Sequence, residues 1–395
     1  MVRMRAGFGV LVLAYVLSQF YRAFLAVLSP VLGAETGATA GDLALASGVW
    51  FAAFAVAQLP IGWGLDRLGP RRTTAWPFIV GGGGGAALFA VAQSPGAIVA
   101  AMALIGVGCA PVLMASFYLF ARSFPPSAFA SLAGLLIGVG SVGNVASAAP
   151  LAWAADAFGW RASVAAVAGL TVLIGVGVLL FVRDPAPAPS AATGGIAELL
   201  RIPGLWVMTP LLIVNYAPAA GIRGLWAGPY LEQVFGLDAA GIGAITLWMA
   251  GAMIVGNFVY GPADRLLGTR KWVLVAGNLA AVAALLALGL APGWSVLAAG
   301  VLLAAVGFFG ASFPLVMAHA RSYYPPHLIG RGVTLANFLA IGGVGVLQIV
   351  SARVHGGVAA SGAGPEAAYR ALFLFFGGLL LAGVVVYLFA EDRLD

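Results

Sequence analysis

Long apolar runs separated by short polar segments make up almost the whole chain. A helix needs about 20 apolar residues to cross a bilayer. The pattern therefore predicts an all-α membrane protein with twelve membrane-spanning helices. The predicted spans are approximately 7–32, 42–65, 73–93, 96–121, 127–152, 161–182, 205–232, 239–263, 272–292, 294–319, 328–353 and 367–390.

One link between the apolar runs is much longer than the others and covers residues 183–204. It begins with alternating Pro and Ala over 185–189 and continues with Ser, Thr and Gly, a composition typical of linkers. A short surface helix is expected within it, near Ala197–Arg201. The link divides the chain into a six-helix bundle at 1–182 and a second one at 205–395.

Composition excludes a water-soluble protein. Hydrophobic residues make up 62% of the chain and charged residues 8%, against about 25% charged in an average soluble domain. A formal net charge of +6 would suit nucleic acid, but the basic residues sit in short links and not on a solvated basic face. The single cysteine, Cys109, excludes an internal disulfide or thiolate metal site. We expect no metal, no cofactor and no nucleic-acid partner.

The basic residues also predict the orientation, because Lys and Arg are enriched on the cytoplasmic side of a membrane. With both termini in the cytoplasm, only Arg161, Arg353 and Arg370 fall outside, while Arg22 and Arg223 lie inside helices. We therefore expect a multi-pass protein of the plasma membrane, the inner membrane of a bacterium. The cytoplasmic set is Arg3, Arg5, Arg67, Arg71, Arg72, Arg122, Arg183, Arg201, Arg265, Arg270, Lys271, Arg321, Arg331 and Arg393.

The two halves of the chain resemble each other. Asp66–Arg72 follows the second span and Asp264–Lys271 follows the eighth, both with the order Asp-Arg-Leu and a nearby Gly. Arg122 after the fourth span is followed by Ser, one aromatic residue and two prolines, and Arg321 after the tenth by Ser, two aromatic residues and two prolines. Repeats at nearly one offset indicate duplication of a six-helix unit, as in parallel-repeat transporters.

The segment Gly62–Arg72 closely resembles the signature between helices 2 and 3 of the major facilitator superfamily, G-x-x-x-D-R-x-G-R-[RK]. It departs from the signature at Pro70. A degenerate copy, here Asp264–Lys271, is usual for that family. The resemblance implies two six-helix bundles, a central cavity at their interface and alternating access by rocking.

The motif residues are charged and lie at helix ends, where Asp66 can pair with cations and with a neighbouring helix N-terminus. Arg122 is a candidate partner, and Gly69 permits a tight turn. We predict a latch that holds the cytoplasmic side shut in one state; the alternative is a plain basic loop that only sets topology. The predicted gating residues are Asp66, Arg67, Arg71, Arg122, Asp264, Arg265 and Arg321.

Two arginines lie inside predicted spans, Arg22 about 15 residues and Arg223 about 18 residues from the helix start. A charge at the bilayer centre costs at least about 2.5–3.5 kcal/mol. The repeat predicts that the two face each other across a pseudo-two-fold axis with an anion between them, since the guanidinium fork suits carboxylate and phosphate. The alternative is that each arginine only ties helix backbones together.

A local resemblance supports the anion. Tyr21–Pro30 is similar to helix 1 of the organophosphate:phosphate antiporters and related organic-anion symporters, in which an arginine precedes a proline by eight positions. In the antiporters a helix 7 arginine completes the anion site, which implies that role for Arg223. The symporters carry an acidic residue at the position of Tyr21, and this chain does not.

Further polar and aromatic side chains could orient a substrate. Gln19 and Tyr15 precede Arg22 by three and seven residues and share its helix face. Packing is the alternative for each. The predicted substrate-binding set is Arg22, Arg223, Gln19, Tyr15, Tyr21, Tyr118, Asn215, Tyr216 and Trp226. The glycine run Gly81–Gly85 lies inside a span and predicts close helix packing, not phosphate binding.

None of the thirteen Asp and Glu residues lies deep in a predicted span, so the usual carboxylate proton relay is missing. His319, near the end of a span, is expected to be structural and not a proton carrier. The sequence favours a monomeric secondary transporter that exchanges small anions across the lipid bilayer. A proton-coupled exporter of hydrophobic or organic compounds is the alternative. A membrane enzyme or sensor has no supporting constellation, so we expect no catalytic residues.

Overall fold

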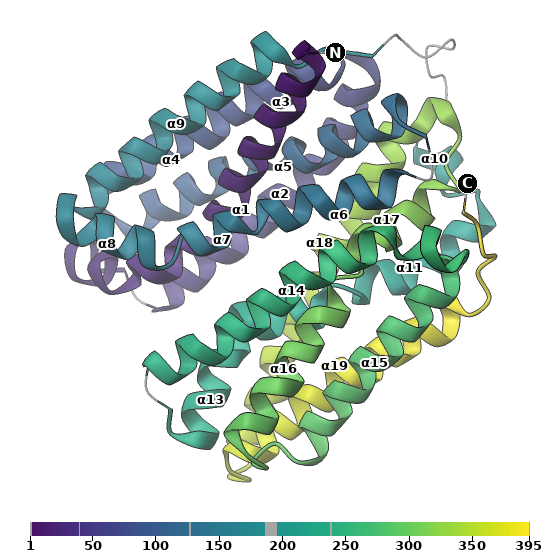
Figure 1. Cartoon of the computed structure of the whole chain (residues 1–395). Coiled ribbons are helices and arrows are strands. Elements are labelled where there is room, and N and C mark those ends of the chain that lie inside the picture. Colours follow the sequence, from purple (N-terminus) through teal and green to yellow (C-terminus); the bar gives the residue numbers. More distant parts are fainter. Residues whose placement is uncertain (1, 39, 126–127, 186–195, 238, 395) are drawn as a thin grey trace. The chain divides into compact units, whose positions relative to one another are not determined.

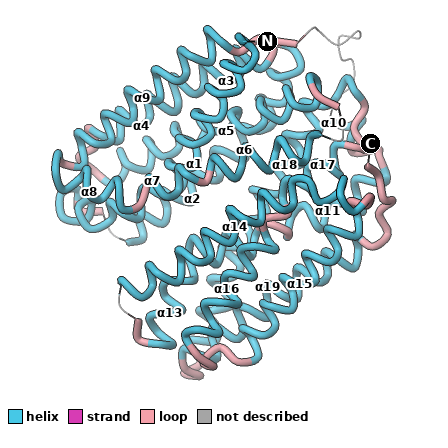
Figure 2. The backbone as a smooth tube through the Cα atoms, viewed as in Figure 1, coloured by secondary structure: helices cyan, strands magenta, loops and turns pink. Residues whose placement is uncertain are grey.

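The computed structural model describes residues 2–38, 40–125, 128–185, 196–237 and 239–394. Within those ranges every regular element is a helix, as Figures 1 and 2 show. Residues 186–195 of the predicted linker lie outside the described residues. A short helix, α10 (Ile196–Leu199), follows them close to the expected position.

The chain forms two compact units. The first comprises Met1–Pro125, Val139–Ile196 and Tyr324–Phe338, and the second comprises Pro126–Gly138, Ala197–Tyr323 and Leu339–Asp395. The division predicted from the sequence, into bundles at 1–182 and 205–395, stays a prediction. The helices of the first half are α1 (Val2–Thr36), α2 (Ala40–Arg67), α3 (Pro70–Pro77), the π-helix η1 (Phe78–Gly83), α4 (Gly84–Ala90), α5 (Pro95–Ser123), α6 (Phe129–Gly140), α7 (Val142–Ala146), α8 (Ala149–Phe158) and α9 (Trp160–Phe181).

The second half repeats the succession of long and interrupted helices. Its elements are α11 (Pro203–Val214), α12 (Ala217–Gly221), the π-helix η3 (Ile222–Trp226), α13 (Ala227–Phe235), α14 (Ala239–Leu267), α15 (Lys271–Leu290), α16 (Val296–Gly310), α17 (Phe313–Arg321), the 3₁₀ turn η4 (Pro326–Leu328), α18 (Ile329–Ala360) and α19 (Pro365–Tyr387).

Within the described residues, 11 helical runs are long and apolar enough to cross a membrane. The remaining predicted span, 73–93, corresponds to α3, η1 and α4. These form one helical stretch from Pro70 to Ala90 that a π-helical segment interrupts. The twelve-helix expectation is thus confirmed, and the interruption falls at Pro77 and the glycine run, where the regular hydrogen-bond ladder is weakest.

The predicted span 205–232 is also broken, into α11, α12, η3 and α13. Pro218 lacks an N–H group, and glycines at 221 and 224 add backbone freedom, so the helix winds into a π-turn over Ile222–Trp226. Single π-turns inside α-helices occur frequently at functional sites. Arg223 lies within this one.

The glycine run of the first half is explained by backbone approach between η1–α4 and α5. A Cβ atom on Gly108 would lie 2.0 Å from the backbone nitrogen of Gly82, and one on Gly81 would lie 2.8 Å from the Leu104 carbonyl oxygen. In Figure 1 α4 lies beside α5 and α9, consistent with the contacts between these elements. Close helix packing is therefore the role of the run, as the sequence predicted.

Both motif loops turn on a glycine in the left-handed region, Gly69 with φ +82° and Gly268 with φ +68°. A carboxylate that follows the last helix of each half then closes the loop. Asp184 accepts a hydrogen bond from the Arg71 backbone N–H at 2.8 Å. Asp392 occupies the equivalent place in the second half, where it accepts from the start of α15. Negative charge at a helix N-terminus is stabilising.

Asp392 receives three donors. The backbone N–H groups of Arg270 and Lys271 donate to its Oδ1 at 3.0 and 2.9 Å, and the Thr269 hydroxyl donates to Oδ2. Partial burial acts to raise the pKa of Asp392, but these hydrogen bonds outweigh it and lower the pKa below its usual value. The carboxylate therefore stays ionised at neutral pH.

Arg270 itself forms a buried ion pair with Asp264. Its Nη2 lies 2.7 Å from Asp264 Oδ2, and the two side chains are 2% and 0% exposed. By contrast the pair between Arg71 and Asp184 is long, at 3.8 Å, and its side chains are 40% and 32% exposed. The equivalent arginines of the two loops thus pair with acids at different positions, one pair buried and the other partly exposed.

We predict that Gly108→Ala lowers the melting temperature of the detergent-solubilised protein by several degrees, because overpacking typically costs about 1–3 kcal/mol. The matched control is Gly84→Ala, where an added Cβ meets nothing within 4 Å. Gly84→Ala should leave the melting temperature unchanged or raise it slightly. Equal effects of the two substitutions would contradict the packing account.

Arg270→Ala should destabilise the protein by about 3–5 kcal/mol, since it leaves the Asp264 carboxylate buried without its partner. Arg71→Ala, at the equivalent exposed position, should cost about 1 kcal/mol or less. Denaturant or thermal unfolding of both variants beside the wild type measures the difference. If Arg270→Ala proved no worse than Arg71→Ala, the buried pair would not have the role assigned to it.

Candidate functional site

Arg22 lies on α1 against two aromatic rings of α2. Its Cζ is 5.3 Å from the centroid of the Trp50 ring and 5.1 Å from that of Phe54, within the range of a cation–π interaction. Its Nε is buried without a hydrogen-bond partner, and none of the ion pairs among the described residues includes Arg22. The ring faces hold the guanidinium group, and no carboxylate in the described part of the chain forms an ion pair with it.

Gln19 and Tyr15 are buried on the same helix, at 4% and 2% exposure. The Tyr15 ring packs so closely on Gly140 that a Cβ there would lie 2.2 Å from ring carbon Cδ1. Tyr15 thus contacts the end of α6, whereas Gln19 remains a buried amide on the turn before Arg22. Their roles toward a substrate stay a prediction.

Tyr21 is engaged within the first unit. Its hydroxyl lies 2.8 Å from Thr171 Oγ1 on α9, and Thr171 donates its own proton to the Val167 carbonyl, so Tyr21 is the donor. Its ring contacts those of Phe20 and Phe24, each at 5.7 Å. These are the contacts of a residue that joins α1 to α9. A substrate-binding role for Tyr21 stays a prediction.

Tyr118 is buried on α5 one turn before Arg122, whose Cζ lies 6.0 Å from the centre of its ring. The pair lies near the end of α5 that carries the Ser-Phe-Pro-Pro sequence. Tyr118 therefore lies beside Arg122, a predicted gating residue, near the end of α5. A substrate-binding role for Tyr118 stays a prediction.

In the second unit Arg223 is half-buried in the π-turn η3. Its Nε is also buried without a hydrogen-bond partner, and no ion pair in the described part of the chain includes it. Arg22 and Arg223 belong to different units, and the predicted facing of their guanidinium groups stays a prediction. Both side chains lie in candidate membrane spans, and neither has an acidic partner within the described ranges.

Trp226 follows Arg223 by three residues and belongs to a cluster that the sequence did not reveal. Its Nε1 donates to Ser351 Oγ at 3.0 Å. The ring of His355 lies between those of Trp226 and Tyr369, with centroid distances of 4.7 Å to each. A serine, a histidine and a tyrosine in otherwise apolar helices were the signal that could have identified these neighbours.

Asn215 is the hub of a second polar cluster in this unit. Its Nδ2 donates to Asn278 Oδ1 at 2.8 Å and to Ser312 Oγ at 2.9 Å, which links α11, α15 and α17. Its Oδ1 has no hydrogen-bond partner among the described residues. The neighbouring Tyr216 packs on Phe313 at 5.7 Å between ring centroids. Asn278 and Ser312 were missed because each alone is unremarkable in a helix.

The motif carboxylate Asp66 forms an ion pair with Arg331 at 3.5 Å, and both side chains are nearly buried. Its Oδ1 also accepts from the Gly330 backbone N–H at 3.1 Å, at the start of α18. The sequence suggested Arg122 as the partner and did not select Arg331. All of these residues belong to the first unit, although Gly330 and Arg331 come from the second half of the sequence.

The repeat copy of the motif behaves differently. Asp264 pairs with Arg270 of its own loop, whereas Arg265 donates to the Ser131 hydroxyl. Arg321 lies over the Phe129 ring, with 5.3 Å between Cζ and the centroid. All four residues of these two contacts belong to the second unit. Arg67 is exposed, and Arg71 makes the long pair with Asp184 described above.

His319 is fully buried and both of its ring nitrogens are used. Nε2 lies 2.9 Å from the Glu391 carbonyl oxygen, which can only accept, so Nε2 carries the proton. Nδ1 then accepts from the Tyr387 hydroxyl at 2.6 Å. The residue fastens the end of α17 to the chain that follows α19, in keeping with the structural role expected of it. In the described residues no group of three or more His, Cys, Asp or Glu could hold a metal ion.

The sequence model of the Major Facilitator Superfamily matches residues 11–224 and 211–395. Solved structures with the same fold include the human organic anion transporter MFSD10 (TETRAN), with 18% identity, TM-score 0.71 and coverage of 97% of this chain and 99% of that one.

Two further structures resemble the chain. The proton:xylose symporter XylE bound to 6-bromo-6-deoxy-D-glucose has 12% identity and TM-score 0.77, and the alignment covers 99% of this chain and 96% of that one. FucP in the outward conformation has 16% identity and TM-score 0.76, with 98% and 99% covered. No curated protein matches the sequence. Since the family model spans nearly the whole chain, the protein belongs to the major facilitator superfamily and is a membrane transporter.

Proposed function

We propose that the protein moves a small anion across the membrane by alternating access, with Arg22 and Arg223 as its binding cations. The observation that carries the proposal is the state of these two side chains. Each lies in a membrane-spanning run, each has a buried Nε without a hydrogen-bond partner, and neither pairs with an acid among the described residues. A cation in that state costs several kcal/mol unless an anion compensates it.

The surroundings of Arg22 favour recognition of a planar oxyanion. Trp50 and Phe54 offer ring faces at 5.3 and 5.1 Å from Cζ. The N–H donors of the guanidinium group lie in its plane, so ring contacts leave them available to a carboxylate or phosphate-like group. Arg223 adds a second fork on a π-turn, a backbone feature that recurs at functional sites.

Exchange of one anion for another is the favoured mode of transport. The acids at the motif loops, Asp66 and Asp264, are both paired with arginines near helix ends. None of the thirteen Asp and Glu residues of the sequence lies deep in a predicted span. A carboxylate relay of the kind that carries protons through many transporters is thus missing. The excess of Lys and Arg on one side of the spans supports cytoplasmic termini in a plasma membrane, and we propose a monomer.

The Asp66–Arg331 pair is the proposed latch of the transport cycle. Asp66 binds the Arg331 side chain and the Gly330 N–H together, so it holds α2 to the start of α18 through two charge-assisted contacts. Alternating access requires such contacts between the two sequence halves to break and reform. Arg122 also acts on this carboxylate through its charge. The remaining predicted gating residues are Arg67, Arg71, Asp264, Arg265 and Arg321, and their part in the cycle stays a prediction.

Counterflow in proteoliposomes with labelled carboxylates and inorganic phosphate tests the site. Arg22→Ala and Arg223→Ala should each lower anion transport about tenfold to a hundredfold, because hydrogen bonds to charged groups are worth about 1.5–3 kcal/mol. Arg201→Ala, at an exposed arginine outside the spans, should retain wild-type rates.

Undiminished transport in both arginine variants would remove the assigned site. A strict requirement for an imposed pH gradient in the wild type would overturn exchange while leaving the anion site intact. The two outcomes are distinguishable because one concerns the variants and the other the driving force.

Asp66→Asn should lower the maximal counterflow rate several-fold with little change in KM, since the carboxylate acts on the conformational step and not on the anion. The charge swap Asp66→Arg with Arg331→Asp should recover part of the rate that either single substitution loses. A raised KM with an unchanged maximal rate would place Asp66 in binding and contradict the latch.

A further inference from the structure

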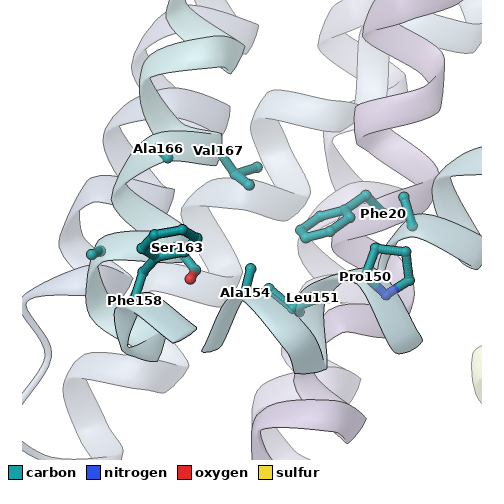
Figure 3. Close-up of a pocket in the computed structure, with 10 residues that line it drawn as sticks. Phe20, Pro150, Leu151, Ala154, Phe158, Ser163, Ala166 and Val167 are labelled. Carbon is teal, nitrogen blue, oxygen red and sulfur yellow. The ribbon is translucent and has the colours of Figure 1, made fainter. Parts of the chain in front are cut away.

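An apolar pocket of about 530 Å³ lies in the first unit between α1, α7–α8 and α9. Figure 3 shows Phe20 of α1 opposite Phe158, Ser163 and Val167, with Leu151 and Ala154 of α8 between them. The residues that line the pocket include neither Arg22 nor any other charged residue. Its volume falls in the range of ligand-binding pockets.

The break between α7 and α8 shapes this pocket. Ala148 leaves helical geometry, with φ −95° and ψ −112°, just before Pro150, which has no N–H group to continue the ladder. The Ser147 hydroxyl instead donates to the Asn144 carbonyl at 2.8 Å. The chain therefore changes direction beside Phe20. Pro150 itself lines the pocket and is exposed.

The polar side chain in the lining is already hydrogen-bonded. Ser163 is its one polar side chain, and its hydroxyl donates to the Gly159 carbonyl at 2.9 Å. A polar ligand would lose its hydration here without gaining a partner, which costs free energy. Hydrocarbon meets no such cost.

The pocket opens toward the surface that faces lipid. Ala162, Ala166 and Phe158 line it and are themselves exposed. Further along α9 the exposed apolar surface continues through Leu173 and Leu180, at 66% and 71% exposure. In a membrane-spanning run such a surface is covered by lipid chains, so the pocket is continuous with the bilayer interior.

The length of the pocket along α9 and the aromatic residues at its end agree with an occupant from the bilayer interior. From the turn at Gly159 to Val167 the lining covers eight residues of helix, about 12 Å at 1.5 Å per residue. One leaflet of the hydrocarbon core is about 15 Å thick. At the turn end, Trp153 and Phe158 are 65% and 67% exposed and pack edge to face at 5.8 Å, as aromatic residues do at the membrane–water boundary.

The shape of an extended hydrocarbon chain suits this pocket. Such a chain is less than half as wide as a helix of about 10 Å, because its carbon atoms approach their neighbours at about 4 Å. It can therefore enter between α1, α8 and α9 and lie along the lining side chains.

We propose that this pocket is a binding site for the hydrocarbon chains of a membrane phospholipid. Its occupant packs against Phe20, two residues before Arg22, and fills the gap that the α7–α8 break leaves beside α1. This site is independent of the anion proposal, since it shares no residue with it.

Photolabelling tests the proposal with the full-length protein in vesicles of phosphatidylethanolamine that carries a diazirine midway along one chain. Phe20 and Leu151 are only 6% and 4% exposed, so a carbene adduct on either reports a chain inside the pocket. We expect adducts on both, mapped by mass spectrometry. Ala166→Phe, which fills the pocket, should reduce them at least threefold.

Ala165→Phe is the matched control, because Ala165 is the exposed neighbour of Ala166 and does not line the pocket. It should leave the adducts unchanged. Ala154→Leu is a second filling variant should Ala166→Phe fail to fold. Lipid added back to delipidated protein should raise the melting temperature of the wild type and of Ala165→Phe more than that of the filling variants.

Two results would overturn the assignment. One is an absence of adducts on Phe20 and Leu151 in the folded wild type, or adducts that both filling variants leave unchanged. The other is a disulfide-linked dimer through Ala166→Cys, together with no lipid adducts, which would assign the pocket to a second copy. The native Cys109 is buried and does not confuse that measurement.

Discussion

The bilayer interior offers no hydrogen-bond partner to the chain, and this constraint determines the rest of the structure. Each backbone N–H and C=O must be satisfied within the protein, so the described spans consist of helices with only short breaks between them. Where proline or glycine interrupts the ladder, as at Pro150 and in η3, neighbouring groups and π-turns take up the freed bonds. The same solvent makes every charge in a span costly unless something compensates it.

The molecule compensates its charges in three ways. Asp264 and Arg270 are buried together and satisfy each other. Asp66 is held by Arg331 and by a helix N-terminus, the contacts that we propose open during transport. Arg22 lies against two ring faces, and neither Arg22 nor Arg223 forms an ion pair among the described residues. The fully paired charges thus have a structural role, the Asp66–Arg331 pair has the proposed gating role, and the two arginines have the proposed substrate-binding role.

Much of the fold could be predicted from the sequence because it follows from local properties. Length and apolarity give the spans, and the repeated Asp-Arg-Leu loops give the duplication. Partners distant in the chain could not be predicted. Arg331 was classified only as a topology residue, and nothing in the sequence connects it with Asp66. Ser351, His355 and Tyr369 likewise gain meaning only through contact with Trp226. Tyr21 shows the opposite case, since its contact with Thr171 gives it a packing role that its neighbour Arg22 obscured.

The central claim is that one anion binds both arginines, and a double-mutant cycle of anion affinity tests it most directly. Binding of labelled phosphate or carboxylate to the purified protein would be measured for the wild type, Arg22→Gln, Arg223→Gln and the double variant. The account predicts that each single change removes most of the affinity and that the double change adds little, because both cations act on one ligand. Losses that add independently, or single variants that bind as tightly as the wild type, would contradict it.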